Sequence, residues 1–144
     1  MMTQKEMMVR LLVAMVLGGL VGFEREIKGR AAGFRTQILV SMGSALMMLT
    51  GIFLKERQPN LTDLDATRIA AQVVVGIGFI GAGAIIRFKD SVRGLTTAAS
   101  VWVSCGVGIA AGAGFYSGAV MTTLMALVVL FLFHDFEKHL RGTH

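Results

Sequence analysis

Cysteine, proline and histidine are scarce in this sequence, whose 144 residues include one Cys, one Pro and three His. The lone Cys105 excludes an internal disulfide, and its apolar neighbours favour a buried thiol that behaves as a small hydrophobe. All three histidines follow residue 133, in a tail that is better explained as the solvated end of a helix than as a metal site. Because no Ser/His/Asp set or metal cluster is evident elsewhere, the sequence does not predict an enzyme.

Acidic residues are also few, whereas apolar residues are abundant. The chain has 9 Asp and Glu against 14 Lys and Arg, with 54% hydrophobic residues and a mean hydropathy of +0.68, which is too apolar for an ordinary soluble domain. A hydrocarbon core about 30 Å thick needs about 20 apolar residues per helix. Five segments meet this need, at about 7–23, 34–54, 69–88, 96–115 and 117–133. We therefore predict an all-α integral membrane bundle of five transmembrane helices, forming one domain over residues 1–144.

The basic residues gather on one side of the predicted membrane. That side carries nine Lys and Arg, namely Arg25, Lys28, Arg30, Arg35, Arg87, Lys89, Arg93, Lys138 and Arg141. The other side carries five, namely Lys5, Arg10, Lys55, Arg57 and Arg68. The positive-inside rule then predicts a cytoplasmic C-terminus and an N-terminus outside, and it explains the net charge of +5 without nucleic-acid binding. No small-x-small site follows the first span, so no cleaved signal peptide is expected.

Small residues recur at helical spacing along three of the predicted spans. Such residues let neighbouring helices approach closely, and we predict helix-packing roles for Gly18, Gly22, Gly76, Gly78, Gly81, Gly83, Ser104, Gly108 and Gly112. The run 76–81 also has the form G-x-G-x-x-G, but it lacks the acidic residue that a dinucleotide site needs about 20 positions further on. In the third span, a locally broken helix that lines a cavity is the alternative to close packing.

Charged residues cluster where the first span ends. Glu24 with Lys28, and Glu26 with Arg30, have the i,i+4 spacing of helical ion pairs. One interpretation is a solvated turn at the membrane edge, where exposed pairs contribute little to stability. The other is that Glu24 faces the bundle and offers its carboxylate to a partner arginine or to a cation.

A sparse internal repeat relates the first two spans to the next two. Its residues match at an offset of 61, with Gly22, Lys28, Gly33 and Thr36 corresponding to Gly83, Lys89, Gly94 and Thr97. Both halves would run in the same direction, as in the parallel repeats of some transporters. In each half a helix starts at the cytoplasmic face, where its free N–H groups with Arg35 or Arg93 could hold an anion, or where Thr36, Thr96 or Thr97 could cap it.

Four blocks of this sequence resemble the MgtC/SapB family and occur in the family's order along the first four spans. They are Gly19-Leu-Val-Gly22-Phe-Glu24-Arg25-Glu26, Ala32-Gly33-Phe-Arg35-Thr36, the run 76–86 and the run 94–102. The resemblance implies a five-helix bacterial inner-membrane protein with a cytoplasmic C-terminus, linked to survival in low magnesium and, in some members, to virulence. It also implies functional roles for Glu24, Arg25, Glu26, Arg35, Thr36, Thr96 and Thr97.

The family's best-studied activity is regulatory and includes inhibition of the F-type ATP synthase. Better-known members carry a soluble C-terminal domain, which we do not expect here because the sequence stops at His144. We therefore predict a non-enzymatic regulator of adaptation to low magnesium that contacts membrane lipid and another membrane protein, such as the F-type ATP synthase, and forms a homo-oligomer such as a dimer. The alternative is a divalent-cation transporter with magnesium bound at Glu24 in its path, and a channel-like or lipid-organising structural protein is a third hypothesis. The absence of acidic residues in the middle of any span argues against transport.

Overall fold

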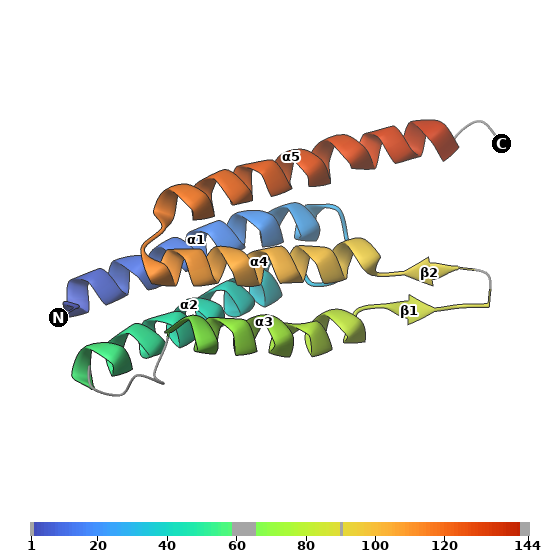
Figure 1. Ribbon diagram of the computed structural model, residues 1–144. Coiled ribbons are helices and arrows are strands. Elements are labelled where there is room, and N and C mark those ends of the chain that lie inside the picture. The colour runs from blue at the N-terminus through green and yellow to red at the C-terminus, as the bar shows by residue number, and fades with distance from the viewer. Residues whose placement is uncertain (1, 59–65, 90, 142–144) are drawn as a thin grey trace.

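The computed structural model describes residues 2–58, 66–89 and 91–141, with side chains up to Leu132. This part of the chain comprises α1 (Gln4–Ile27), α2 (Phe34–Arg57), α3 (Ala66–Gly83), β1 (Ile86–Arg87), β2 (Val92–Arg93), α4 (Leu95–Ala113) and α5 (Tyr116–Arg141) (Figure 1). Helices α1 to α4 are long and apolar enough to cross a membrane, and the described apolar part of α5, Tyr116–Leu132, is shorter. The predicted all-α membrane bundle is therefore confirmed.

Local interactions fix the start of α1 and the end of α4, which lie at the same end of the bundle. Thr3 and Glu6 form a capping box at the start of α1, because the Thr3 hydroxyl accepts from the Glu6 amide and the Glu6 carboxylate accepts from the Thr3 amide. Helix α4 ends at Ala113 and is followed by the C-cap residue Gly114, whose φ of +82° suits glycine. Arg10 of α1 donates from Nη1 to the Gly112 carbonyl at 2.9 Å, so a cation meets the negative end of the α4 dipole.

The third predicted span, 69–88, extends beyond the helix that the structure shows. Helix α3 ends at Gly83, and the chain continues into an antiparallel hairpin in which Ile86 pairs with Arg93 and Arg87 pairs with Val92. Gly94 closes this hairpin with a φ of +91°, in a position where a Cβ atom would overlap the Ala84 carbonyl oxygen. The span was predicted too long because Ile85 and Ile86 are as apolar as a transmembrane segment and are equally suited to a strand.

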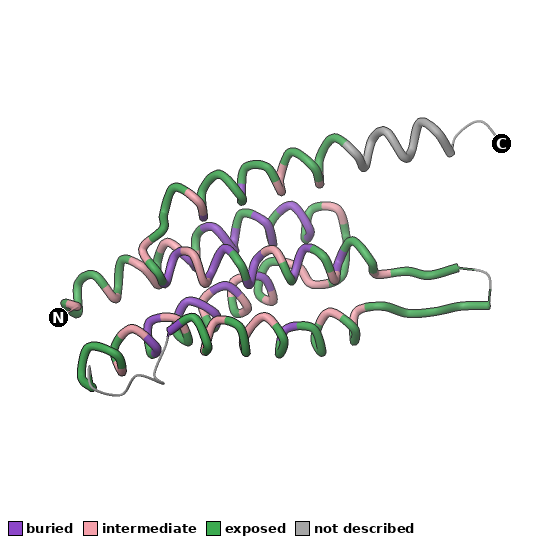
Figure 2. Tube along the Cα trace, in the orientation of Figure 1, coloured by how far each residue is buried: buried purple, intermediate pink, exposed green. Residues whose placement is uncertain are grey.

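Helices α1, α2 and α4 form the buried centre of the bundle, where small residues bring their backbones together (Figure 2). A Cβ atom on Gly18 of α1 would lie 2.8 Å from the Gln37 carbonyl oxygen of α2. On α4, a Cβ atom on Gly112 would lie 2.6 Å from the Ala45 carbonyl oxygen, and one on Gly108 would overlap the Ser41 carbonyl. The apolar core beside these contacts consists of Ala14, Leu17, Ala45, Val107, Ala111 and Ala119.

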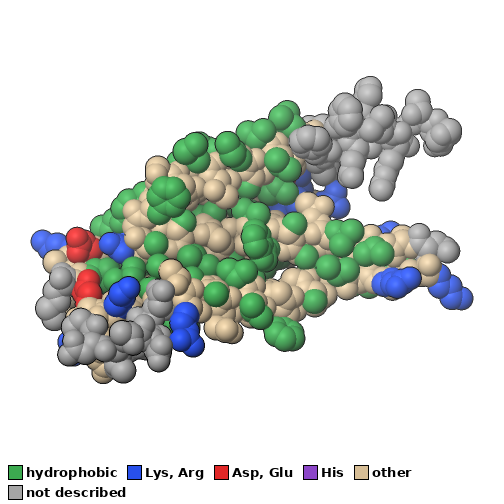
Figure 3. Space-filling model, in the orientation of Figure 1, with side chains coloured by type: hydrophobic (Ala, Val, Ile, Leu, Met, Phe, Trp, Pro, Cys, Tyr) green, Lys and Arg blue, Asp and Glu red, His purple; other side chains and the backbone are tan. Residues whose placement is uncertain are grey.

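The glycines of α3 occupy a different environment. Helix α3 packs against α2 and α4, while α5 packs against α1 and α4. A Cβ atom on Gly81 would lie 3.8 Å from Ala98, but nothing in the described part of the chain lies within 4 Å of one on Gly76, Gly78 or Gly83. Phe79 on the same helix is 81% exposed. Apolar side chains also cover the middle of the surface in Figure 3, as expected for helices that face lipid.

One pair of glycines from the sparse repeat, Gly33 and Gly94, consists of the N-cap residues of α2 and α4. Their backbones differ, because Gly33 has a φ of −76° and Gly94 a φ of +91°. Among the described residues, no threonine hydroxyl caps either helix. The internal repeat therefore stays a prediction.

Candidate functional site

The last turn of α1 buries an ion pair inside the bundle. Glu24 and Arg25 are 1% and 3% exposed, and Arg25 Nε donates to Glu24 Oε2 at 2.8 Å. Charged groups at this depth in a membrane bundle are expensive unless they are paired. The structure thus supports the interpretation in which Glu24 faces the bundle and meets an arginine, and that arginine is its own neighbour in the sequence.

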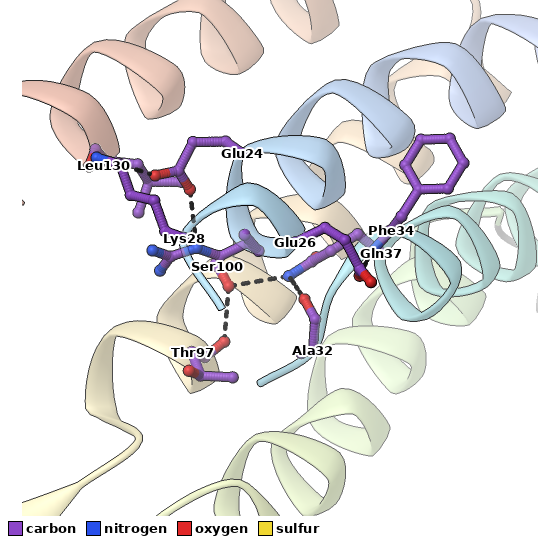
Figure 4. A network of polar contacts seen from close by, with 10 residues as sticks. Glu24, Glu26, Lys28, Ala32, Phe34, Gln37, Thr97, Ser100 and Leu130 are labelled. Atoms are coloured by element: carbon purple, nitrogen blue, oxygen red, sulfur yellow. Dashed lines mark hydrogen bonds and ion pairs between the residues drawn. The ribbon is translucent and has the colours of Figure 1, made fainter. Parts of the chain in front are cut away.

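Lys28 adds a second cation and connects this pair to α5. Its Nζ atom lies 3.4 Å from Glu24 Oε1, which confirms the i,i+4 pair predicted from the sequence. The same ammonium group donates to the Leu130 carbonyl at 3.2 Å (Figure 4). It also lies 4.8 Å from the centre of the Phe131 ring. One carboxylate therefore faces two cations, and Lys28 links α1 to α5. We call Glu24, Arg25 and Lys28 the charge cluster.

A chain of neutral hydrogen bonds links α2 to α4 at the same end of the bundle. Gln37 is completely buried, and its Nε2 donates to the Ala32 carbonyl at 3.1 Å and to Ser100 Oγ at 2.9 Å. Ser100 Oγ in turn donates to the Thr97 carbonyl at 2.8 Å (Figure 4). Gly22 of α1 makes room for this chain, since a Cβ atom there would lie 3.0 Å from the Gln37 Cβ. These hydrogen bonds hold the N-terminal ends of α2 and α4 together.

Glu26 has a different role from Glu24, although only two residues separate them. Its side chain is exposed, and its Oε2 accepts from the Phe34 amide at 3.1 Å, at the first residue of α2. Gly33 lies directly against this carboxylate, which a Cβ atom would overlap. Glu26 therefore caps α2 in place of a side chain on the N-cap glycine. No ion pair joins Glu26 to Arg30 in the described part of the chain, so that sequence-based prediction was wrong.

Replacing Glu26 with alanine should destabilise the protein by about 1 kcal/mol, the usual effect of losing a helix N-cap. The measurement is the free energy of unfolding in mixed detergent micelles, followed by circular dichroism. Arg30→Ala is the matched control, because Arg30 is exposed near the same loop and is expected to change stability by less than about 0.5 kcal/mol. Equal effects of the two substitutions would contradict the capping role of Glu26.

The remaining predicted site residues lie near these groups but contribute less. Thr97 is buried and takes part through its carbonyl, Thr36 is half-buried, and Arg35 and Thr96 are exposed. In the part of the chain that the structure describes, the side chains of Arg35, Thr36 and Thr96 make no hydrogen bond or ion pair. The site therefore unites Glu24, Arg25 and the Thr97 backbone with Lys28, Gln37 and Ser100. The sequence did not reveal the contact of Lys28 with α5 or the bond between Gln37 and Ser100.

Comparison with known proteins places the chain in a family. The sequence model of the MgtC family matches residues 11–139. The chain belongs to the MgtC family. It is 43% identical over 132 residues to the protein named "Putative magnesium transporter YhiD" of Escherichia coli K12, covering 90% of this chain and 61% of that protein.

Two further relatives of the MgtC-family chain show similar identity. An uncharacterized protein of Haemophilus influenzae is 44% identical over 123 residues, covering 83% of this chain and 52% of that protein. Protein MgtC of Salmonella typhimurium LT2 is 42% identical over 125 residues, covering 87% and 51%. The chain thus spans about half to three fifths of the length of these relatives. No solved structure matches the chain.

The charge cluster, Gln37 and Ser100 all lie within the segment that the MgtC family model matches. Among the described residues, no group of three or more His, Cys, Asp and Glu lies close enough to hold a metal ion. The side chains of the histidine-containing tail after residue 133 lie outside the described residues. Metal binding at Glu24 stays a prediction.

Proposed function

We propose that this chain is a non-enzymatic protein of magnesium homeostasis in a bacterial inner membrane, where it regulates another membrane protein. Membership of the MgtC family and the name of the Escherichia coli relative support the connection with magnesium. The observation that carries the regulatory role is the closed charge cluster, in which the carboxylate of Glu24 is 1% exposed and faces both Arg25 and Lys28. The excess of Lys and Arg at the ends of α1 and α3 favours a cytoplasmic C-terminus.

The cluster is poorly arranged for a passing divalent cation. Magnesium prefers carboxylate oxygens and keeps several of its waters. Glu24 Oε2 is held by Arg25 Nε at 2.8 Å, and Lys28 Nζ is 3.4 Å from Oε1. A magnesium ion that approached Glu24 would be repelled by both neighbours and would have to displace at least one of them. This arrangement supports a structural use of the carboxylate, which holds the helices in register for a partner.

The outward face of α3 is the surface that we propose for such a partner. Gly76 and Gly83 share one side of the helix and have open space around them in the described chain, so another helix could approach the α3 backbone closely there. The proposed partners are a second copy of this chain, giving a homo-oligomer such as a dimer, and a membrane enzyme such as the F-type ATP synthase.

Transport of magnesium is the second candidate function, and two oxygen atoms favour it. Glu24 Oε1 and Gln37 Oε1 are buried and accept no hydrogen bond from the described residues. Carboxylate and amide oxygens are ligands of hard cations, and unpaired buried acceptors are uncommon without a ligand or water. If Lys28 moved toward solvent, these oxygens would be available to an ion on a path between α1, α2 and α4.

Magnesium flux into proteoliposomes, reported by an internal dye, separates the two functions. Because the charge cluster is closed, we expect the wild type to give no more flux than empty vesicles, with circular dichroism showing that the protein is folded. Flux that is present in the wild type and in Glu26→Gln but absent in Glu24→Gln would establish transport through Glu24 and contradict the regulatory proposal. Glu26→Gln is the matched control, since Glu26 is exposed and lies outside the charge cluster.

A further inference from the structure

The β1–β2 hairpin connects the C-terminal end of α3 to the N-terminal end of α4 and extends along the direction of these helices (Figure 1). Two residues separate α3 from β1 and one separates β2 from α4. The Phe88 amide donates to the Ser91 carbonyl at 2.8 Å near the tip of the hairpin. At its base, the left-handed Gly94 lies against the Ala84 carbonyl and keeps the two strands together. The hairpin is therefore held at the membrane surface by two transmembrane helices.

The lengths of the elements place the hairpin at the depth of the lipid headgroups. Helix α3 has 18 residues, which rise about 27 Å at about 1.5 Å per residue, close to the hydrocarbon thickness of about 30 Å. Each headgroup layer adds about 5 to 8 Å, and a strand of two residues, the length of β1 and of β2, extends about 7 Å. The two strands therefore lie within the layer of the headgroups.

The hairpin exposes basic and apolar side chains together (Figure 3). Ile86, Phe88 and Val92 are about half exposed, at 56%, 51% and 49%. Paired residues share a face of a sheet, so Ile86 and Arg93 lie on one face with Phe88, and the Arg93 guanidinium is 5.5 Å from the Phe88 ring centre. Arg87 and Val92 share the other face, and exposed Lys89 follows at the tip.

We propose that this hairpin is a binding surface for anionic phospholipid headgroups. Arg87, Lys89 and Arg93 supply the positive charge that phosphate groups attract, and Ile86, Phe88 and Val92 supply the apolar surface that the interface accommodates. Both faces carry this mixture, as expected for a hairpin surrounded by lipid rather than one that rests on a single protein surface. Two membrane helices bring the hairpin to the headgroups, so no separate recruitment step is needed. Lipid binding by the hairpin requires neither magnesium nor transport. Its test can therefore give a negative result while the regulatory proposal still holds.

The test places a tryptophan in the hairpin of the full chain, as Phe88→Trp in a Trp102→Phe background, and measures its quenching by bromine-labelled lipids in proteoliposomes. We expect labelled phosphatidylglycerol to quench this residue at least about fivefold more effectively than labelled phosphatidylcholine at equal mole fraction, because each basic residue near an anionic surface contributes about a fivefold preference. Salt should weaken the preference. Val92→Trp serves as the reporter if Phe88→Trp does not fold.

Neutralising the hairpin with Arg87→Gln, Lys89→Gln and Arg93→Gln should remove the preference. The matched control removes three charges from the other end of the bundle, with Lys5→Gln, Lys55→Gln and Arg57→Gln, and should retain it. Equal quenching by the two lipids in the wild-type hairpin would overturn the proposal. A hairpin tryptophan that no lipid quenches and that acrylamide reaches freely would also overturn it, and would leave an acidic protein surface as the occupant.

Discussion

Replacing Gly108 with alanine should separate α2 from α4 and lower the free energy of unfolding by about 3 kcal/mol or more, at the upper end of the usual effect of overpacking. The added Cβ atom would overlap the carbonyl oxygen of Ser41 and would lie 2.9 Å from the Ser41 Cα. These are backbone atoms and cannot rotate away as a flexible side chain would. Ser41 Oγ also donates to the Ala14 carbonyl at 2.8 Å, so a shift of α2 would disturb its contact with α1.

Gly106 of the same helix is the matched control for this substitution. It is exposed, and nothing in the described chain lies within 4 Å of a Cβ atom placed there. Because alanine favours a helix by about 1 kcal/mol over glycine, Gly106→Ala should leave stability unchanged or raise it. Unfolding in mixed detergent micelles, followed by circular dichroism, measures both. Equal effects of the two substitutions would contradict the close approach of α2 and α4.

The pattern of small residues predicted which side of each helix allows close packing better than it predicted which helix packs there. Gly18 and Gly22 of α1 and Gly108 and Gly112 of α4 lie against α2, as their four-residue spacing indicates. Gly76 of α3 belongs to an equally clear pattern but faces open space in the described chain. Spacing shows that a helix has a small-residue face, whereas the neighbour of that face depends on the arrangement of all the helices.

The same distinction applies to the candidate site. The Glu24–Lys28 pair could be predicted because i,i+4 residues of a helix are neighbours. The Glu24–Arg25 pair could not be predicted, since adjacent residues of a helix do not normally face each other. This pair forms because both side chains are buried inside the bundle, where they meet. The bond from Gln37 to Ser100 joins residues 63 positions apart and depends on the contact between α2 and α4. The contact at i,i+4 spacing was therefore accessible from the sequence, whereas the Glu24–Arg25 pair and the contacts between helices were not.

The Glu24→Gln substitution should lower the free energy of unfolding by about 3 to 5 kcal/mol, the usual effect of removing one partner from a buried ion pair. Glutamine has nearly the same shape as glutamate, so the loss arises from charge rather than from packing. Lys28 is 14% exposed and can turn toward solvent, but Arg25 is 3% exposed and would remain buried without a counter-charge. Arg25 should therefore account for most of the destabilisation. The measurement is the same unfolding titration in mixed micelles.

A double substitution separates this charge effect from a loss of shape. If the unpaired Arg25 causes the destabilisation, Glu24→Gln combined with Arg25→Gln should be more stable than Glu24→Gln alone, because no buried charge remains in the pair. Glu24→Gln combined with Lys28→Gln should give a smaller recovery, since Lys28 already reaches solvent. If both double variants were as unstable as Glu24→Gln, the carboxylate would be needed for a contact other than the one with Arg25. A partner or ion at Glu24 Oε1, which accepts no hydrogen bond from the described residues, would then be the remaining explanation, and the transport hypothesis would gain support.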